Sequence, residues 1–233
     1  MCICIFVDVE KLHQQELLKM IQEGENERQD FKFAITDSRK IARSLSAFAN
    51  TKGGRLLIGV KDNGKIAGVR SDEEYYMVES AAQLYSRPEI KIKPKIWKFE
   101  GKTVLEVSVP ESRGKPHYVV ESDGSKYSYV RVADQNIKAN EVIRKVWELK
   151  KQNKNRLVRY SEAEEKLFSL LNDNEPISLN QFKKRAQIPH QLAIKTLANM
   201  IVFELIYMEI GEHFTNYFLN NDNSIDTYSN FIR

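Results

Sequence analysis

The strongest constraint on the fold is the stretch from Ser46 to Gly68, which reads SAFANTKGGRLLIGVKDNGKIAG. It begins as the end of an amphipathic helix, passes through a glycine pair, and enters the most apolar run of the chain, Leu56 to Val60. Residues 61–65 form a polar turn in which Asp-Asn-Gly favours a tight reversal of the chain. The stretch therefore predicts a helix, a glycine exit, a buried strand and a hairpin in immediate succession.

Helical and alternating patterns around this stretch predict an α+β domain over residues 1–150. Helices are expected at residues 8–21, from 37 or 38 to 49, at 71–86 and at 140–151, where apolar residues recur every three or four positions. Strands are expected at 30–34, 55–61, 90–99, 102–109, 117–121 and 126–132. Lysines alternate through 91–98, which is typical of a sheet edge protected against pairing with other chains. The fold class is therefore a mixed or antiparallel sheet with packed helices.

A second pattern follows a basic connector at residues 151–160. Ser161 is expected to cap a first helix, Ser178 a second one over 179–186, and a third helix should span 190–203. Strands are expected at 205–210 and 214–219. Three helices and a hairpin in residues 161–220 predict a small winged-helix domain. Residues 221–233 are polar and are expected to form a loose tail.

Composition excludes several classes of protein. A chain of 233 residues with 42% hydrophobic and 29% charged residues is an ordinary globular chain. No run approaches the roughly 18 apolar residues of a membrane helix, and the apolar opening MCICIFV lacks the other features of a signal peptide. Cys2 and Cys4 predict neither a zinc site nor a disulfide framework, and we interpret them as part of a first strand or a frayed start. We expect a cytoplasmic protein with no membrane partner.

Charge is distributed unevenly along the chain. Residues 1–159 hold 30 Lys and Arg against 22 Asp and Glu, a net charge of +8. Residues 160–233 hold 6 against 10, a net charge of −4. A basic front part of this kind favours a polyanionic partner for the first domain.

Five motifs, taken together, resemble the Schlafen/AlbA-type DNA-binding domain. They are GE-x4-DFK at 24–32, AFANTKGG at 47–54, GVKDNGKIAGV at 59–69, VPESRGKPHYV at 109–119 and YVRVADQNIKA at 129–139. Their order fits that of the family across roughly residues 20–150, and the region behind resembles the winged-helix domains appended to such proteins in bacteria. The resemblance implies nucleic-acid binding and a role as a transcriptional regulator.

The same resemblance implies an alternative, catalytic function. Glu25, Asp30 and Asp62 match positions that form an acidic metal-binding site in Schlafen-type nucleases, beside a lysine that matches Lys32. Carboxylate oxygens suit Mg²⁺ or Mn²⁺, and Asp30 and Lys32 would share one face of a strand. However, the family usually has Glu where Asp30 stands, and Asp62 before Asn-Gly is also a standard turn residue. A metal-dependent endonuclease acting on RNA or DNA is therefore the alternative to a non-catalytic protein without metal or cofactor.

Basic residues support nucleic-acid binding without reference to the family, because they neutralise phosphates. In the first domain the predicted contacts are Arg39, Lys40, Arg43, Lys52, Arg55, Arg113, Lys115 and Arg131. In the second domain the predicted contacts are Lys184, Arg185, Gln191 and Lys195. The helix from His190 would enter the major groove of a winged-helix complex, although the same domain would equally serve dimerisation or docking of a partner.

Two other interpretations of the first domain were weighed. Gly54 to Lys61 has glycines and a lysine like a phosphate-binding loop, but Lys61 is one residue late and no Ser or Thr follows it. A sensor that binds a small anionic ligand and transmits the signal through the winged helix is a further hypothesis. The favoured prediction is a homodimeric transcriptional regulator that binds DNA or RNA.

Overall fold

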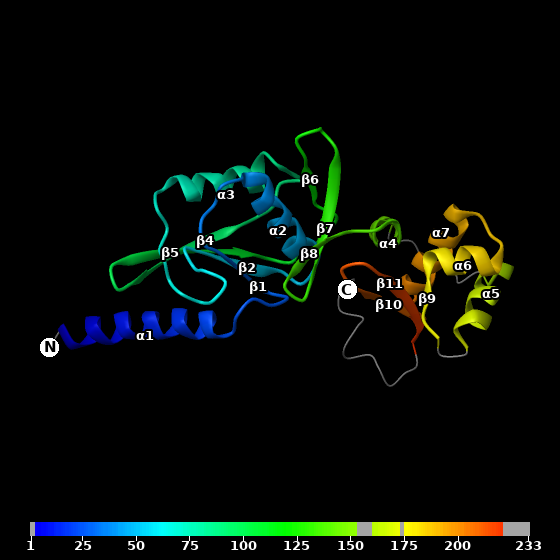
Figure 1. Cartoon of the computed structure of the whole chain (residues 1–233), viewed down its shortest axis with the longest axis horizontal. Helices are drawn as coiled ribbons and strands as arrows, with labels where there is room; N and C mark the ends of the chain where they lie inside the picture. The colour runs from blue at the N-terminus through cyan, green and yellow to red at the C-terminus, as the bar shows by residue number, and fades with distance from the viewer. Residues whose placement is uncertain (1–2, 153–159, 173–174, 221–233) are drawn as a thin grey trace. The chain divides into compact units, whose positions relative to one another are not determined.

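The computed structural model describes residues 3–152, 160–172 and 175–220, with only the backbone described for residues 3–10 (Figure 1). The chain forms two compact units, unit 1 (Met1–Lys138) and unit 2 (Ala139–Arg233). The boundary lies twelve residues before the predicted end of the first domain at residue 150. Most of the predicted linker, and all of the predicted tail at 221–233, lie outside the described residues.

Unit 1 is built on a four-stranded mixed sheet. Its strands are β1 (Gln29–Lys32), β2 (Gly54–Ile58), β4 (Lys93–Phe99) and β5 (Lys102–Val109), in the spatial order β1-β2-β5-β4. β1 runs parallel to β2, while β5 is antiparallel to both β2 and β4. The lysine-rich β4 therefore lies at an edge of the sheet, as its alternating pattern predicted.

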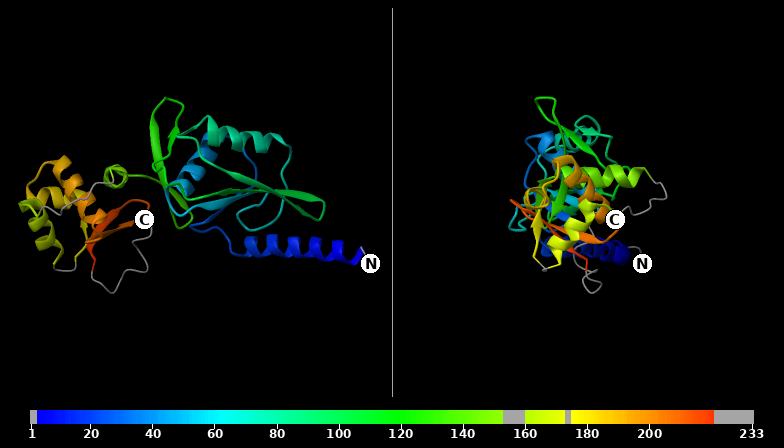
Figure 2. Two further views of the ribbon diagram at one scale, coloured as in Figure 1. Left: turned by 180° about the vertical axis from the view of Figure 1, so that it is seen from behind. Right: turned by 90° about the vertical axis from the view of Figure 1, so that its right-hand side faces the viewer.

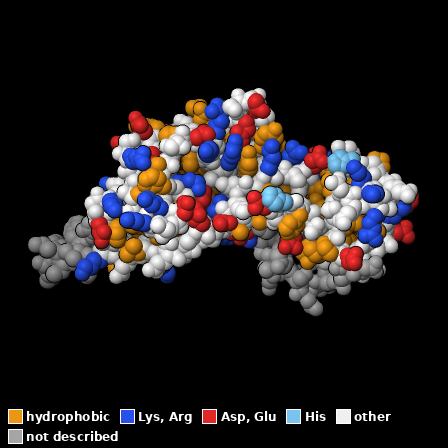
Figure 3. Space-filling view, viewed as in Figure 1, with side chains coloured by type: hydrophobic (Ala, Val, Ile, Leu, Met, Phe, Trp, Pro, Cys, Tyr) orange, Lys and Arg blue, Asp and Glu red, His pale blue; other side chains and the backbone are white. Residues whose placement is uncertain are grey.

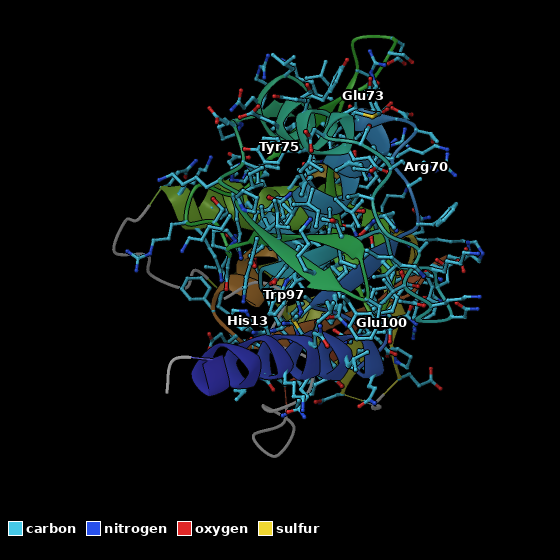
Figure 4. The ribbon with its side chains drawn as sticks, turned by 90° about the vertical axis from the view of Figure 1, so that its left-hand side faces the viewer. His13, Arg70, Glu73, Tyr75, Trp97 and Glu100 are labelled. Carbon is cyan, nitrogen blue, oxygen red and sulfur yellow. The ribbon has the colours of Figure 1, made fainter. Side chains whose placement is uncertain are left out.

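Helices cover both faces of this sheet (Figures 1 and 2). α1 (Ile3–Gln22) lies on one face, where Leu17 packs with Phe31 and Trp97, and Figure 4 shows His13 of this helix beside Trp97. α2 (Ser38–Asn50) and α3 (Glu73–Gln83) cover the other face. The expected strand or frayed start before residue 8 was wrong, because the helix already begins at Ile3. Extending an existing helix costs little, since each added residue forms one more hydrogen bond.

α2 is the centre of unit 1. Asp37 caps it as predicted, accepting a hydrogen bond from the backbone N–H of Arg39, and Gly53 follows it with a φ of 73°. The pattern predicted one buried face, but the helix is buried almost all round from Ile41 to Asn50. Small residues on its remaining faces let a second sheet approach closely. That sheet comprises β3 (Ser86–Arg87), β6 (Tyr118–Val120), β7 (Lys126–Val132) and β8 (Gln135–Lys138), in the order β3-β6-β7-β8.

The chain reverses after β2 without forming a second regular strand. The backbone N–H of Lys61 donates to the carbonyl of Lys65 at 3.0 Å, and Val60 forms an isolated bridge with Ile66. The predicted turn is confirmed. The second strand of the expected hairpin is absent from the described sheets, because β1 and β5 already occupy both sides of β2.

Unit 2 contains four described helices and a small sheet. The helices are α4 (Glu141–Lys151), α5 (Glu162–Leu171), α6 (Leu179–Ala186) and α7 (His190–Val202). The strands are β9 (Ile177–Ser178), β10 (Ile206–Ile210) and β11 (Thr215–Leu219), in the order β10-β11-β9. Ser161 and Ser178 cap their helices as predicted, and each forms a capping box with the residue three positions later. α4 belongs to this unit because its buried apolar face, which includes Trp147, packs against α7.

Candidate nucleic-acid interface

A buried polar cluster surrounds Asp30 in the middle of unit 1. The Asp30 carboxylate is 3% exposed and accepts hydrogen bonds from Lys32 Nζ at 2.9 Å and from Ser44 Oγ at 3.1 Å. The guanidinium of Arg131 approaches the same carboxylate at 3.5 Å. The predicted shared face of Asp30 and Lys32 is therefore present, and both carboxylate oxygens of Asp30 are already bound by groups of the protein.

Glu25 lies beside this cluster, in the turn before β1. Its Oε1 accepts a hydrogen bond from the backbone N–H of Phe31 at 2.9 Å. Burial and a hydrogen bond with the Asp30 carboxyl raise the pKa of Glu25 above its ordinary value. Glu25 therefore lies close to a second carboxyl group, which disfavours the ionised form of Glu25.

Asp62 does not join these two acids. It is exposed in the turn after β2, where Asp-Asn-Gly forms the reversal. Within residues 3–152, 160–172 and 175–220, no group of three or more His, Cys, Asp or Glu side chains is placed to hold a metal ion. Glu25, Asp30 and Asp62 are therefore not gathered into such a group among the described residues.

Arg131 is part of the interior, which differs from its predicted place on a nucleic-acid surface. It is 1% exposed, and its guanidinium donates to the carbonyls of Asn26 and Gln29 and to Oδ1 of Asn136. Its backbone N–H donates to Thr51 Oγ1 at 2.9 Å. These bonds join β7 to the turn before β1 and to the end of α2. Arg131 therefore holds unit 1 together and is not available to a phosphate.

Several predicted cations are already neutralised by carboxylates of unit 1. The pairs are Arg43 with Glu121, Lys52 with Glu27, Arg55 with Glu23 and Lys115 with Glu111. Such pairs between partly exposed groups are weak and break at small cost. Binding of these cations to phosphate would nevertheless have to compete with an existing partner.

The pair of Arg43 with Glu121 is the most elaborate of these. Arg43 donates two hydrogen bonds to Glu121, at 2.9 and 2.7 Å, and the hydroxyl of Tyr129 donates a third at 2.9 Å. The hydrogen bond from Arg43 lowers the pKa of Glu121 below its ordinary value. Burial and the neighbouring carboxylate raise the pKa of Tyr129 to about 12. The three side chains tie α2 to the β6–β7 hairpin.

Lys40 and Arg113 are the predicted cations of unit 1 that are exposed. Arg39 is half-buried, with its guanidinium carbon 4.7 Å from the centre of the Tyr85 ring. Lys93, Lys95 and Lys98 are exposed along the edge strand β4. Figure 3 shows Lys and Arg side chains spread over the visible face with acidic side chains between them. The cations of unit 1 thus do not all belong to one cluster.

In unit 2 the predicted contact residues are all exposed. Lys184 and Arg185 lie in the last turn of α6, and Gln191 and Lys195 lie four residues apart on α7. Residues at this spacing point to the same side of a helix. His190 Nε2 forms a 2.7 Å contact with Glu141 of α4 and is half-buried. The structure therefore presents Lys184, Arg185, Gln191 and Lys195 at the surface.

Unit 1 carries a smaller net positive charge than the +8 counted over residues 1–159, because it ends at Lys138. Unit 1 holds 23 Lys and Arg against 20 Asp and Glu, which is a net charge of only +3. Residues 139–159 hold 7 against 2, and this segment begins unit 2. Most of the basic surplus predicted for the first domain is therefore carried by α4 and the residues that follow it.

One exposed aromatic residue was missed by the sequence interpretation. Phe33 follows β1 directly and is 41% exposed, with Lys61 and Arg70 beside its ring. The alternation in DFKFA suggested an ordinary strand residue at this position. The feature that distinguishes Phe33 is the presence of the two cations Lys61 and Arg70 beside its ring. Their approach to Phe33 depends on the fold.

Comparisons with known proteins agree with the motifs. Residues 25–140 match the family described as "Schlafen, AlbA_2". The DIP2311 protein from Corynebacterium diphtheriae aligns with a TM-score of 0.37 and 18% identity, over 52% of this chain and 24% of that one. The N-terminal domain of a protein from Nitrosomonas europaea, named as related to the ATP-dependent DNA helicase RecG, aligns with a TM-score of 0.37 and 24% identity, over 52% of this chain and 90% of that one. This chain thus spans about a quarter of the DIP2311 protein.

A search of curated proteins gave no match. Among the described residues, no helix is both long enough and apolar enough to cross a membrane.

Proposed function

Because residues 25–140 belong to the Schlafen AlbA_2 family, we propose that this protein binds nucleic acid without cleaving it and regulates transcription. Family membership alone does not specify a partner, since one fold hosts many functions. The proposal therefore depends on where the chain offers cations and hydrogen-bonding groups to a polyanion.

The observation that carries the proposal is the exposed surface formed by the end of α6 and one side of α7, defined by Lys184, Arg185, Gln191 and Lys195. None of the four forms an ion pair with another residue in the described part of the chain. The opposite side of α7, including Ala193 and Leu197, is buried against the rest of unit 2. A rigid helix with one free polar side is suited to docking into a groove.

Unit 2 would bind as a winged helix, with α7 in the major groove. Gln191 would contact base edges, since an amide can form two hydrogen bonds to adenine, and Lys195 could pair with guanine. Lys184 and Arg185 would contact phosphates and set the register of the helix. Lys40 and Arg113 of unit 1 would add further phosphate contacts.

A homodimer in the cytoplasm completes the proposal. Two copies would place two α7 helices on half-sites roughly one helical turn of DNA apart, about 34 Å. A two-fold symmetric site is therefore the sequence pattern to look for in the target DNA.

The test is fluorescence anisotropy of a labelled duplex with the full chain over a series of salt concentrations. The double variant Lys184→Ser/Arg185→Ser is expected to flatten the slope of log K against log salt by about 1 to 2, because each lost phosphate contact removes about 0.9. The matched control is Lys145→Ser/Lys166→Ser, which removes two cations of the same unit that are paired with Glu148 and Glu162. Equal slopes for the two double variants would reject α6 as the contact, and no duplex binding at low salt would reject the proposal.

The metal-dependent endonuclease is less well supported, because Glu25, Asp30 and Asp62 do not form a group placed to hold a metal ion among the described residues. Cleavage of RNA and DNA probes with Mg²⁺ or Mn²⁺ tests it directly. Cleavage that is present in the wild-type protein and lost in Asp62→Asn would favour this alternative over the non-catalytic proposal.

A further inference from the structure

The carboxyl ends of β1 and β2 meet at one end of the sheet of unit 1, since the two strands are parallel and Lys32 pairs with Ile58. Phe33 leaves β1 at this end, and the turn that begins at Lys61 leaves β2 there. Two segments that are far apart in the sequence thus expose their side chains at one place. This place belongs to unit 1, whereas α6 and α7 belong to unit 2.

Phe33 is an exposed aromatic ring held between cations. The Lys61 Nζ lies 5.2 Å from the ring centre, and the Cζ of Arg70 also lies 5.2 Å from it. Figure 4 shows Arg70 at the periphery of unit 1. Both cationic side chains are exposed. We call these three residues, Phe33, Lys61 and Arg70, the Phe33 platform.

The charges of the Phe33 platform have no carboxylate partner among the described residues. Acids follow both cations in the sequence, Asp62 after Lys61 and residues 72–74 after Arg70. Glu74 accepts a 2.7 Å hydrogen bond from the backbone N–H of Arg70, and Asp62 follows Lys61 in the exposed turn. The platform therefore differs from Arg43, Lys52, Arg55 and Lys115, each of which is paired with an acid.

Packing within unit 1 does not account for the exposed ring of Phe33 and its two cations. Phe31, two residues earlier, is 1% exposed and belongs to the core under α1, whereas Phe33 keeps 41% of its surface exposed. Exposed cation–π contacts are weak compared with burial of an aromatic ring. A ring that leaves 41% of its surface exposed, with two unneutralised cations beside it, is suited to a ligand that offers both a π face and negative charge.

We propose that the Phe33 platform binds single-stranded nucleic acid, with an unpaired base on the Phe33 ring and the adjoining phosphates at Lys61 and Arg70. Aromatic rings next to cations are the combination by which proteins bind single strands without sequence preference. A duplex cannot use the ring, because its bases are already stacked on one another. The platform does not depend on duplex binding by unit 2, and the two sites can be tested separately.

The experiment measures anisotropy of labelled single-stranded DNA and RNA of about 12 nucleotides with the full chain. Phe33→Leu keeps an apolar side chain but removes the ring, and is expected to weaken single-strand binding at least fivefold, while duplex binding stays unchanged. Tyr76→Leu is the matched control, since Tyr76 is 62% exposed on α3 and contacts Tyr75 rather than a cation. Comparing the affinities for the DNA and RNA probes shows which nucleic acid the Phe33 platform prefers.

An abasic single strand separates stacking from charge. The wild-type protein and Phe33→Leu should bind the abasic strand equally. Lys61→Ser and Arg70→Ser should each flatten the slope of log K against log salt by about 0.7, for the abasic and the ordinary single strand alike. Unchanged urea midpoints for Phe33→Leu would show that the fold is intact. The proposal is overturned if the wild-type protein binds no single strand, if Phe33→Leu binds like the wild type, or if it loses duplex and single-strand binding alike.

Discussion

Replacing Arg131 by Met tests whether this residue belongs to the interior or to a nucleic-acid surface. The substitution keeps an unbranched side chain but removes three hydrogen bonds to Asn26, Gln29 and Asn136 and the approach to Asp30. Removing one partner of a buried charged pair costs about 3 to 5 kcal/mol. Asp30 keeps Lys32 and Ser44 as partners, so we expect the lower end, about 3 kcal/mol. For a unit of this size that corresponds to a fall in Tm of roughly 10 °C.

The two tryptophans let the stability of unit 1 be measured alone. Trp97 is buried in unit 1 and Trp147 is buried in unit 2, where its Nε1 has no hydrogen-bond partner within the described residues. Trp147→Phe therefore removes no described hydrogen bond and leaves Trp97 as the reporter of unit 1. In that background, urea unfolding followed by fluorescence should show a lower midpoint for Arg131→Met.

Arg113→Met is the matched control, because it removes the same charge from an exposed loop of the same unit. It should leave the urea midpoint unchanged. A normal midpoint for Arg131→Met together with weaker nucleic-acid binding would refute the assignment of Arg131 to the interior.

Three further substitutions probe unit 1 by urea unfolding. Because Arg43 lowers the folded pKa of Glu121, the advantage of the wild type over Glu121→Gln should be present above pH 4.5 and shrink as the pH falls through the lowered pKa. The folded pKa of Glu25 is raised by burial and by Asp30, so Glu25→Gln should stabilise unit 1 at pH 7, and the gain should vanish below pH 4.5; a constant gain would contradict this. Gly53→Ala should lower the free energy of unfolding of unit 1 by more than about 1 kcal/mol, because φ is 73° and the new Cβ would lie 2.8 Å from backbone atoms of Val109 and Glu111; an unchanged urea midpoint would count against it.

Features set by neighbours in the chain were predictable. Asp37, Asn140, Ser161 and Ser178 all cap the helices assigned to them, because a cap needs only a side-chain oxygen and a backbone N–H two or three residues away. The bounds of β5 and the order of three helices and a hairpin in unit 2 also agree with the sequence pattern.

Features set by long-range contacts were not predictable. Unit 1 ends at Lys138, before the predicted boundary, because the apolar face of α4 packs against α7, some fifty residues later in the chain. Asp30 and Asp62 each belong to a motif of the family. However, Asp62 lies in an exposed turn, whereas Asp30 lies in a buried polar cluster. A pattern of residue types does not specify which side chains the tertiary fold brings within ligand distance of one another.

The amino-acid sequence by itself indicated most of the helices and strands, the glycine exit from α2 and the family of residues 25–140. Only the tertiary structure decided which charged residues face solvent. Burial depends on what packs above a side chain, so Arg131 became an interior residue and Arg43 the partner of Glu121, while Phe33 stayed exposed beside Lys61 and Arg70. The candidate nucleic-acid contacts could therefore be chosen only after the fold was known.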